Sequence, residues 1–255
     1  MSGDRRIATA WEFEVELQDR CARRCERFGF GTALFQPDLP LVYDENFLRI
    51  ERRFDDVDAA ALAAEAERLQ GRAKLMHRKA VVPHELAGER LSAGLARLGW
   101  RRSILATMAH RGERPGRPGH RVRELDSAAV RKSRSKALWE GLSSDPAGSQ
   151  VVRHLELLAQ AVPTRVFGIE VEEEVAAWCV LYEEGGIGQI DDVVTLREHR
   201  RRGYGRAVVQ AALAASLDAG NQLTFLVADD EDWPKQMYAG LGFEPVGRRY
   251  EFTRT

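Results

Sequence analysis

The chain has 255 residues, of which 44% are hydrophobic and 30% are charged, a composition typical of a globular protein. Its formal net charge of −1 provides no bulk attraction to nucleic acid or to an anionic membrane, and three cysteines cannot form a disulfide framework. No apolar run is long enough to span a bilayer, and residues 1–6 lead into no signal-type apolar core, so we expect a cytoplasmic protein that binds neither nucleic acid nor membrane.

The first 110 residues contain predicted helices and strands in alternation. A segment of mixed aromatic and charged residues predicts a first helix at residues 11–28. The next elements are expected in the order strand, Ala-rich helix, apolar strand, helix and closing strand, at residues 41–51, 58–70, 73–82, 85–98 and 103–110. The turn Leu98-Gly99-Trp100 precedes the closing strand.

Residues 110–120 (HRGERPGRPGH) have the composition of a linker. They are rich in glycine, proline and arginine and contain no apolar side chain. We therefore divide the chain into an N-terminal domain at residues 1–110, a linker at 111–120 and a C-terminal domain at 121–255.

The second half begins with a predicted strand at 121–125 and two helices. The first helix is capped by Asp126-Ser127 and ends near residue 141, and the second runs over 143–162. After them we expect a hairpin of strands at 164–171 and 175–183, a strand at 187–196, a helix at 204–219 and a strand at 222–228. A short helix that begins at Trp233-Pro234 and the last strands at 246–254 complete the chain.

The two halves share a pattern. When Leu98-Gly99-Trp100 is placed over Leu241-Gly242-Phe243, both halves have a strand, an Ala-rich helix, an apolar strand, a helix, this turn and a closing strand. A tandem duplication explains the pattern most simply. The alternative is one mixed α/β domain in which the alternation of helices and strands only resembles a repeat.

A second informative stretch is Arg200-Arg201-Arg202-Gly203-Tyr204-Gly205-Arg206, which lies where a predicted strand leads into a helix. The first backbone N–H groups of a helix have no partner within it, the helix dipole favours negative charge there, and glycine permits close approach. Such a junction suits a diphosphate. The spacing matches neither the dinucleotide-binding fingerprint nor the P-loop.

Arg200-x-x-Gly203-x-Gly205 resembles the pyrophosphate loop, Arg/Gln-x-x-Gly-x-Gly/Ala, of the GNAT superfamily of N-acetyltransferases. Residues 237–245 (MYAGLGFEP) resemble the second hallmark of that superfamily, a helix carrying Leu-Tyr-x-x-x-Gly-Phe. The resemblance implies an α/β (α+β) fold of two tandem GNAT-like domains, each a mixed, mostly antiparallel sheet flanked by helices, with a degenerate N-terminal copy.

The same resemblance implies acetyl-coenzyme A as co-substrate. Its diphosphate is expected on the loop, at Arg200, Arg201, Arg202, Gly203, Tyr204, Gly205 and Arg206. Its pantetheine arm is expected on the backbone of the preceding strand, at Val193, Val194 and Thr195. Asp232 stands where family members often carry an asparagine that contacts this arm. Cys21 and Cys25 lie one helical turn apart, but no histidine or third cysteine is near, so we expect no metal.

Acetyl transfer from a thioester to an amine needs a proton acceptor for the amine and a proton donor for the departing thiolate. The resemblance places Tyr238 beside the coenzyme sulfur as the donor. Gln189 stands about where several family members carry a catalytic glutamate, and glutamine cannot accept a proton. Asp191 and Asp192 follow in an otherwise apolar strand whose broken alternation predicts a bulge. Asp191 is our first choice of base, Asp192 the second, and a water chain without a dedicated base a third alternative.

The N-terminal half lacks this chemistry. Residues 52–58 contain three carboxylates and no glycine, and Leu95 takes the place of Tyr238. We therefore expect coenzyme A to bind only the C-terminal half, and the N-terminal half to have a structural or acceptor-shaping role.

The acceptor is expected to be a small-molecule amine or a protein N-terminus or lysine, in a pocket near Trp139, Glu140 and His154. The competing functional hypothesis is a non-catalytic module that binds or senses acyl-coenzyme A. Nucleic-acid binding through residues 200–206 is disfavoured by the nearly neutral charge, and the sequence does not indicate an oligomeric state.

Overall fold

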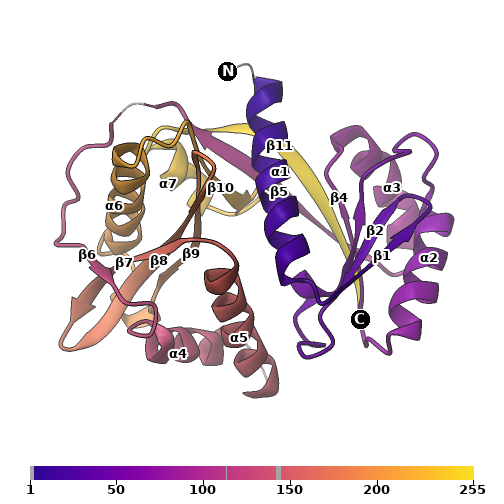
Figure 1. The fold of residues 1–255 in the computed structure, drawn as a ribbon, viewed down its shortest axis with the longest axis horizontal. Coiled ribbons are helices and arrows are strands. Elements are labelled where there is room, and N and C mark those ends of the chain that lie inside the picture. Colours follow the sequence, from indigo (N-terminus) through magenta and orange to yellow (C-terminus); the bar gives the residue numbers. More distant parts are fainter. Residues whose placement is uncertain (1–2, 113, 142–144) are drawn as a thin grey trace.

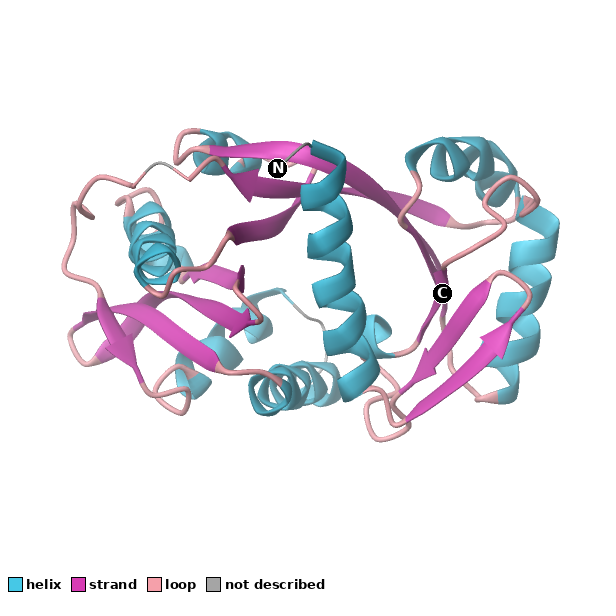
Figure 2. Ribbon diagram, turned by 45° about the horizontal axis from the view of Figure 1, so that its top comes forward, coloured by secondary structure: helices cyan, strands magenta, loops and turns pink. Residues whose placement is uncertain are grey.

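A computed structural model describes residues 3–112, 114–141 and 145–255. The chain forms two lobes joined by long strands that arch from one lobe to the other, with the first helix between the lobes (Figure 1). Figure 2 shows the same arrangement from a view turned by 45°. None of the helices in the described ranges is both long and apolar enough to cross a membrane.

The N-terminal half begins with helix α1, which is followed by a hairpin and then by alternating strands and helices. The elements are α1 (Gly3–Cys21), β1 (Arg24–Phe28), β2 (Gly31–Phe35), the 3-10 turn η1 (Tyr43–Glu45), β3 (Phe47–Ile50), α2 (Ala59–Arg72), β4 (Arg78–Val82), α3 (Glu85–Arg97) and β5 (Arg101–His110). The expected helix at 11–28 is wrong beyond Cys21, because residues 24–28 pair with β2 and bury Phe28 in the core.

The C-terminal half follows the expected order closely. Its elements are β6 (Arg123–Leu125), α4 (Arg131–Gly141), α5 (Asp145–Ala161), β7 (Thr164–Val171), β8 (Glu174–Glu184), β9 (Ile187–Thr195), α6 (Tyr204–Asp218), β10 (Leu223–Asp229), α7 (Pro234–Ala239) and β11 (Phe243–Arg254). Helix α4 begins at Arg131, later than expected, because Asp126 caps a turn by accepting from the Ala128 N–H at 2.8 Å. The expected start of the next helix at 143–144 lies outside the described residues.

All strands within the described residues belong to one sheet, in the order β1-β2-β3-β4-β11-β5-β10-β9-β8-β7-β6. The contacts β3–β4 and β9–β10 are parallel, and the other paired strands are antiparallel. The expected mixed, mostly antiparallel sheet flanked by helices is therefore confirmed. The two halves build this sheet together instead of forming two separate sheets.

The last strand of each half lies beside a strand of the other half. Strand β5 lies between β11 and β10, and β11 lies between β4 and β5 (Figures 1 and 2). Tyr250 and Phe252 of β11 are buried in the core of the N-terminal lobe, and Ala106 and Met108 of β5 are buried in the core of the C-terminal lobe. Burying such side chains stabilises each lobe by roughly 1.5–3 kcal/mol per large residue, so each lobe depends on a strand from the other half.

Helix α1 also connects the halves. Although it is the first element of the chain, its apolar face packs on the sheet of the C-terminal lobe, where Phe13 and Leu17 share a core with Trp178 and Phe225. The rings of Phe13 and Phe225 meet edge to face with centroids 5.9 Å apart. This packing places Glu14 and Gln18 of α1 in the wall of a cavity that Asp191 of strand β9 also lines.

Candidate active site

The loop before α6 has the backbone geometry expected for an anion site. Gly203 precedes the helix in the left-handed conformation, at φ 81° and ψ 4°, and no described side chain caps the N-terminus of α6. Its N–H groups therefore remain available. Arg201 also has a positive φ of 62°, and the Arg200 Nε donates to the Thr195 carbonyl at 3.2 Å, which fixes the entry to the loop. Arg200, Arg201, Arg202 and Arg206 are all exposed.

Strands β9 and β10 separate beside this loop. Their parallel pairing covers only residues 187–189 of β9 and 223–225 of β10, whereas β9 continues to Thr195 and β10 to Asp229. Beyond Gln189, the edge of β9 that faces β10 therefore has no strand partner within the described residues. Val193, Val194 and Thr195 lie on this open edge, where an extended chain can pair with backbone groups. Tyr204 and Gly205 begin α6 next to it, and a Cβ on Gly205 would lie 3.3 Å from the Thr195 hydroxyl oxygen.

The predicted bulge in β9 is present. Trp178 pairs with Val194 and Val180 with Asp191, so the register shifts between them, and Asp192 has a positive φ of 48°. The bulge separates the environments of the two aspartates. Asp192 Oδ2 accepts from Arg134 Nε at 2.9 Å, from Arg134 Nη2 at 2.6 Å and from Trp178 Nε1 at 2.8 Å. Burial raises the pKa of Asp192, although the adjacent Arg134 guanidinium lowers it.

Asp191 has a different environment from Asp192. Its Oδ1 accepts from the Asp192 backbone N–H at 2.8 Å, and no described cation forms an ion pair with it. Its side chain lines the cavity described below. Of the two aspartates, it is therefore the one whose carboxylate lacks a cationic partner.

Tyr238 lies in α7, on the C-terminal lobe, and is only 8% exposed. Burial, together with the nearby Cys179, Asp191 and Asp232, raises the pKa of its phenol to about 12. The phenol therefore keeps its proton throughout the neutral range and is a hydrogen-bond donor there. Asp232 lies in the exposed turn before α7, where its Oδ1 accepts from the Trp233 N–H at 2.7 Å.

A cavity of about 500 Å³ lies between the two halves, next to β9. Its wall combines residues of α1, η1, β3, β4 and β11 with residues of α4, α5, β8 and β9, and includes Arg200 of the loop. His154 lies in this wall, and its Nδ1 is 2.8 Å from Glu45 Oε1. Burial disfavours the charged imidazole, but the Glu45 carboxylate outweighs that effect and raises the pKa of His154. The side chains of Trp139 and Glu140 lie outside the described residues.

Several residues in this wall were not predicted from the sequence. Glu14, Glu45, Arg134 and Arg249 come from four segments far apart in the chain. The one available signal was Glu14, a carboxylate only 7% exposed between the buried Phe13 and Leu17. A charged residue on the apolar face of a helix needs a partner, and Arg249 provides it at 2.7 Å.

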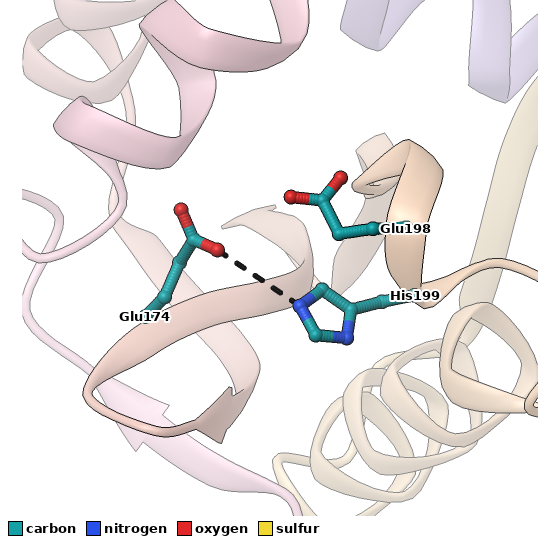
Figure 3. A group of neighbouring side chains, drawn as sticks. All are labelled: Glu174, Glu198 and His199. Atoms are coloured by element: carbon teal, nitrogen blue, oxygen red, sulfur yellow. Dashed lines mark ion pairs between the residues drawn. The ribbon is translucent and has the colours of Figure 1, made fainter.

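One side-chain group has the composition of a metal site. Ligand atoms of Glu174, Glu198 and His199 lie within 4.8 Å of one another (Figure 3). However, the Lys136 ammonium lies 2.9 and 3.0 Å from the two Glu174 oxygens and also contacts Glu198. A cation of the chain thus already contacts both carboxylates of this group.

Comparison with protein-family models agrees with the motifs. A segment of the chain, residues 135–243, matches the family described as Acetyltransferase (GNAT) family. It contains the loop at 200–206, the two aspartates and Tyr238. No curated protein gives a significant match to the sequence.

Solved structures with the same fold extend the likeness to the whole chain. A functionally unknown conserved protein from Staphylococcus epidermidis ATCC 12228 has a TM-score of 0.71 and 16% identity, covering 91% of this chain and 94% of its own. A GCN5-related N-acetyltransferase from Kribbella flavida has a TM-score of 0.63 and 18% identity, covering 97% and 95%. A tandem GNAT protein from the clavulanic acid biosynthesis pathway has a TM-score of 0.52 and 19% identity, covering 76% and 69%. At these identities the likeness establishes the fold alone.

Proposed function

We propose that this protein is an acetyl-coenzyme A-dependent N-acetyltransferase that transfers the acetyl group directly to an amine bound in the cavity between the halves. The observation that carries the proposal is the position of strand β9. Its open edge leads to the uncapped N-terminus of α6, while Asp191 and Val194 of the same strand line the cavity. A coenzyme on the edge and an acceptor in the cavity would meet at this strand.

The chain offers suitable groups for the coenzyme. The backbone N–H groups at Gly203, Tyr204 and Gly205 are available to diphosphate oxygens, because no described side chain occupies the helix N-terminus. Exposed arginines at 200–202 and 206 add charge-assisted hydrogen bonds of roughly 1.5–3 kcal/mol each. Val193–Thr195 would pair with the pantetheine arm, and Asp232 lies at the turn near it. When bound, acetyl-coenzyme A would supply the acetyl group, and coenzyme A would leave as a thiolate that takes up a proton from solvent.

Asp191 is assigned as the proton acceptor. A lysine-like amine with a pKa near 10.4 costs roughly 4–5 kcal/mol to deprotonate at pH 7. A carboxylate without a cationic partner attracts the ammonium form and then takes its proton, directly or through a water. Asp192 is not assigned this role, because Arg134 and Trp178 already donate three hydrogen bonds to it.

Tyr238 is assigned as the donor to the departing thiolate. Its raised pKa, about 12, means that the phenol is protonated whenever the thiolate forms at neutral pH. Because an acid this weak does not release its proton readily, its main contribution is a hydrogen bond that stabilises the developing negative charge.

We further propose that the N-terminal half is a degenerate copy of the C-terminal half that now shapes the acceptor cavity. Two observations support this. The order of strands and helices from β1 to β5 recurs from β7 to β11. When β1 to β5 are matched one by one with β7 to β11 and β6 is left out, matching strands lie at equal distances from the two ends of the sheet. The N-terminal half also supplies Glu14, Asp44 and Glu45 to the cavity.

A thiol-release assay with acetyl-coenzyme A and a panel of amines tests the function, with mass spectrometry of the product. We expect one acetylated amine for each thiol released. Coenzyme binding by calorimetry without turnover of any amine would instead indicate the non-catalytic binding module.

A further inference from the structure

The wall of the cavity between the halves is acidic. It contains three guanidinium groups and one imidazole against six carboxylates, those of Glu14, Asp44, Glu45, Asp191, Asp192 and Glu251. Because like charges repel, this wall disfavours an anionic acceptor and favours a cationic one.

Most of these carboxylates are paired within the protein. Glu14 pairs with Arg249 at 2.7 Å, Glu45 with His154 at 2.8 Å, and Asp192 with Arg134 at 2.6 Å. The Lys79 ammonium lies 2.5 Å from Asp44 and 2.6 Å from Glu251. Asp191 is left without an ion-pair partner among the described residues.

Two further acceptor atoms of the wall are buried without a donor. Glu14 Oε2 and Gln189 Oε1 have no hydrogen-bond partner among the described residues, and the two residues are only 7% and 6% exposed. Arg249 donates to the other Glu14 oxygen only. Buried acceptors are normally satisfied, so both atoms indicate a ligand that brings N–H or O–H donors.

The acceptor groups lie on two walls that come from different halves. Glu14 is on α1, whereas Gln189 and Asp191 are on β9. Burial raises the pKa of Glu14 against the opposing effect of Arg249, and the charge of Asp191 raises it further, so the two carboxylates lie within electrostatic range of each other. One amino group at each of these two walls would give both of them a donor.

Resting on the proposed function, we infer that the acceptor is a compact molecule with at least two amino groups. One amino group binds as an ammonium at Glu14, and the other is presented to Asp191 for acetylation, with Gln189 accepting an N–H beside it. A volume of about 500 Å³ is within the usual range for small-molecule sites. A protein lysine brings a single cation and would leave Glu14 Oε2 without a donor.

The test compares an amine that has one amino group with amines that have two or more. We expect kcat/KM for 1,4-diaminobutane and spermidine to exceed that for butylamine by about 10- to 100-fold, the usual effect of one charge-assisted hydrogen bond. Glu14→Gln keeps the shape of the side chain and removes its charge, so it should lower the ratio of the diamine and butylamine kcat/KM values about tenfold. Glu16→Gln is the matched control, since Glu16 lies on the same helix with 67% of its side chain exposed.

A second measurement does not depend on turnover. Calorimetry of 1,4-diaminobutane and butylamine binding to the wild-type protein and to Glu14→Gln should show the same ratio change. Equal affinity for the two amines, or an unchanged ratio in a Glu14→Gln protein with wild-type melting temperature, would overturn the inference and leave acetyl transfer standing. Tight diamine binding without any acetylated product would support the inference and count against the proposed function.

Discussion

The two halves use the same position in the fold, the N-terminus of the helix after a parallel strand, in opposite ways. In the C-terminal half, Gly203 starts α6 with a left-handed backbone, and no described side chain caps the helix. In the N-terminal half, the Asp58 side chain caps α2 by accepting from the Ala61 N–H at 2.7 Å. A carboxylate therefore occupies in one half the place where the other half leaves amides open to an anion.

The strands that precede these helices also differ, since in the described part of the chain only the strand of the C-terminal half has an open edge. Beyond its last parallel pair, β9 continues for most of its length, but β3 ends at Ile50, directly after Arg49 pairs with Val81. Helices α2 and α3 are also packed closely, since a Cβ on Gly94 would lie 2.5 Å from the Ala59 Cβ. Within the described residues, the N-terminal half thus has neither the open strand edge nor the open helix end of the C-terminal half, although its strands belong to the shared sheet.

The largest expected effect concerns the shared strands. Residues 121–255 expressed alone lack β5, which separates β10 from β11 and carries Ala106 and Met108 of the C-terminal core. We expect this fragment to show no cooperative thermal unfolding by circular dichroism. The full chain cut at a protease site inserted into loop 111–122 is the control, and it should remain one particle in size-exclusion chromatography. Cooperative unfolding and coenzyme binding by the fragment would show that the halves are independent domains.

The difference between the helix ends predicts a single coenzyme site per chain. Gly203→Asp places a carboxylate against the diphosphate and should weaken coenzyme A binding more than about 1,000-fold in calorimetry, because attraction is replaced by repulsion. Gly203→Asn tests the backbone alone, since asparagine tolerates the left-handed conformation without adding charge. Asp55→Ala, in the N-terminal half, should have no effect. Two sites per chain would contradict the comparison.

Substitutions of the two aspartates of β9 should have different effects, one on the catalytic rate and the other on the stability of the fold. Asp191→Asn should lower kcat by about 100- to 10,000-fold near neutral pH, with partial recovery at high pH, where the amine is already deprotonated. Asp192→Asn removes the charge that pairs with the buried Arg134, so it should lower the free energy of unfolding by about 3–5 kcal/mol. If Asp192→Asn instead lowers kcat at unchanged stability and Asp191→Asn is silent, the base is assigned wrongly.

A smaller effect is expected for Tyr238, whose place in the N-terminal half is taken by Leu95. Tyr238→Phe keeps the ring and removes one hydrogen bond to the developing thiolate, worth roughly 1.5–3 kcal/mol, so kcat should fall by about 10- to 150-fold. Coenzyme affinity should be unchanged. The assignment fails if the variant keeps full single-turnover rates with acetyl-coenzyme A.

The smallest expected effect is on the contact between the halves across the cavity. His154 of α5 pairs with Glu45 of η1, and its pKa is raised above the ordinary value of 6.5. A raised pKa in the folded state stabilises the protein fully below pH 6.5, and this contribution is lost as the pH rises through the raised pKa. The difference in unfolding free energy between wild type and His154→Gln should therefore be largest below pH 6.5. A difference that grows with pH would contradict the ion pair.

The sequence predicted most of the C-terminal half correctly. The strand at 187–196, its bulge and the helix at 204–219 are confirmed, because apolar periodicity is a local signal. The N-terminal half was predicted less well. The hairpin β1–β2 was missed, since residues 24–28 form a strand only when they pair with residues 31–35.

By itself, the sequence determined which half carries a glycine- and arginine-rich loop, where Tyr238 lies, and that two carboxylates interrupt an apolar strand. Only the tertiary structure decided that β5 and β11 lie side by side, that Arg134 and Trp178 bind Asp192 and not Asp191, and that α1 brings Glu14 to the cavity. The physical reason is distance along the chain. Loop chemistry depends on neighbouring residues, whereas strand partners, ion pairs and cavity walls join segments that meet only after folding.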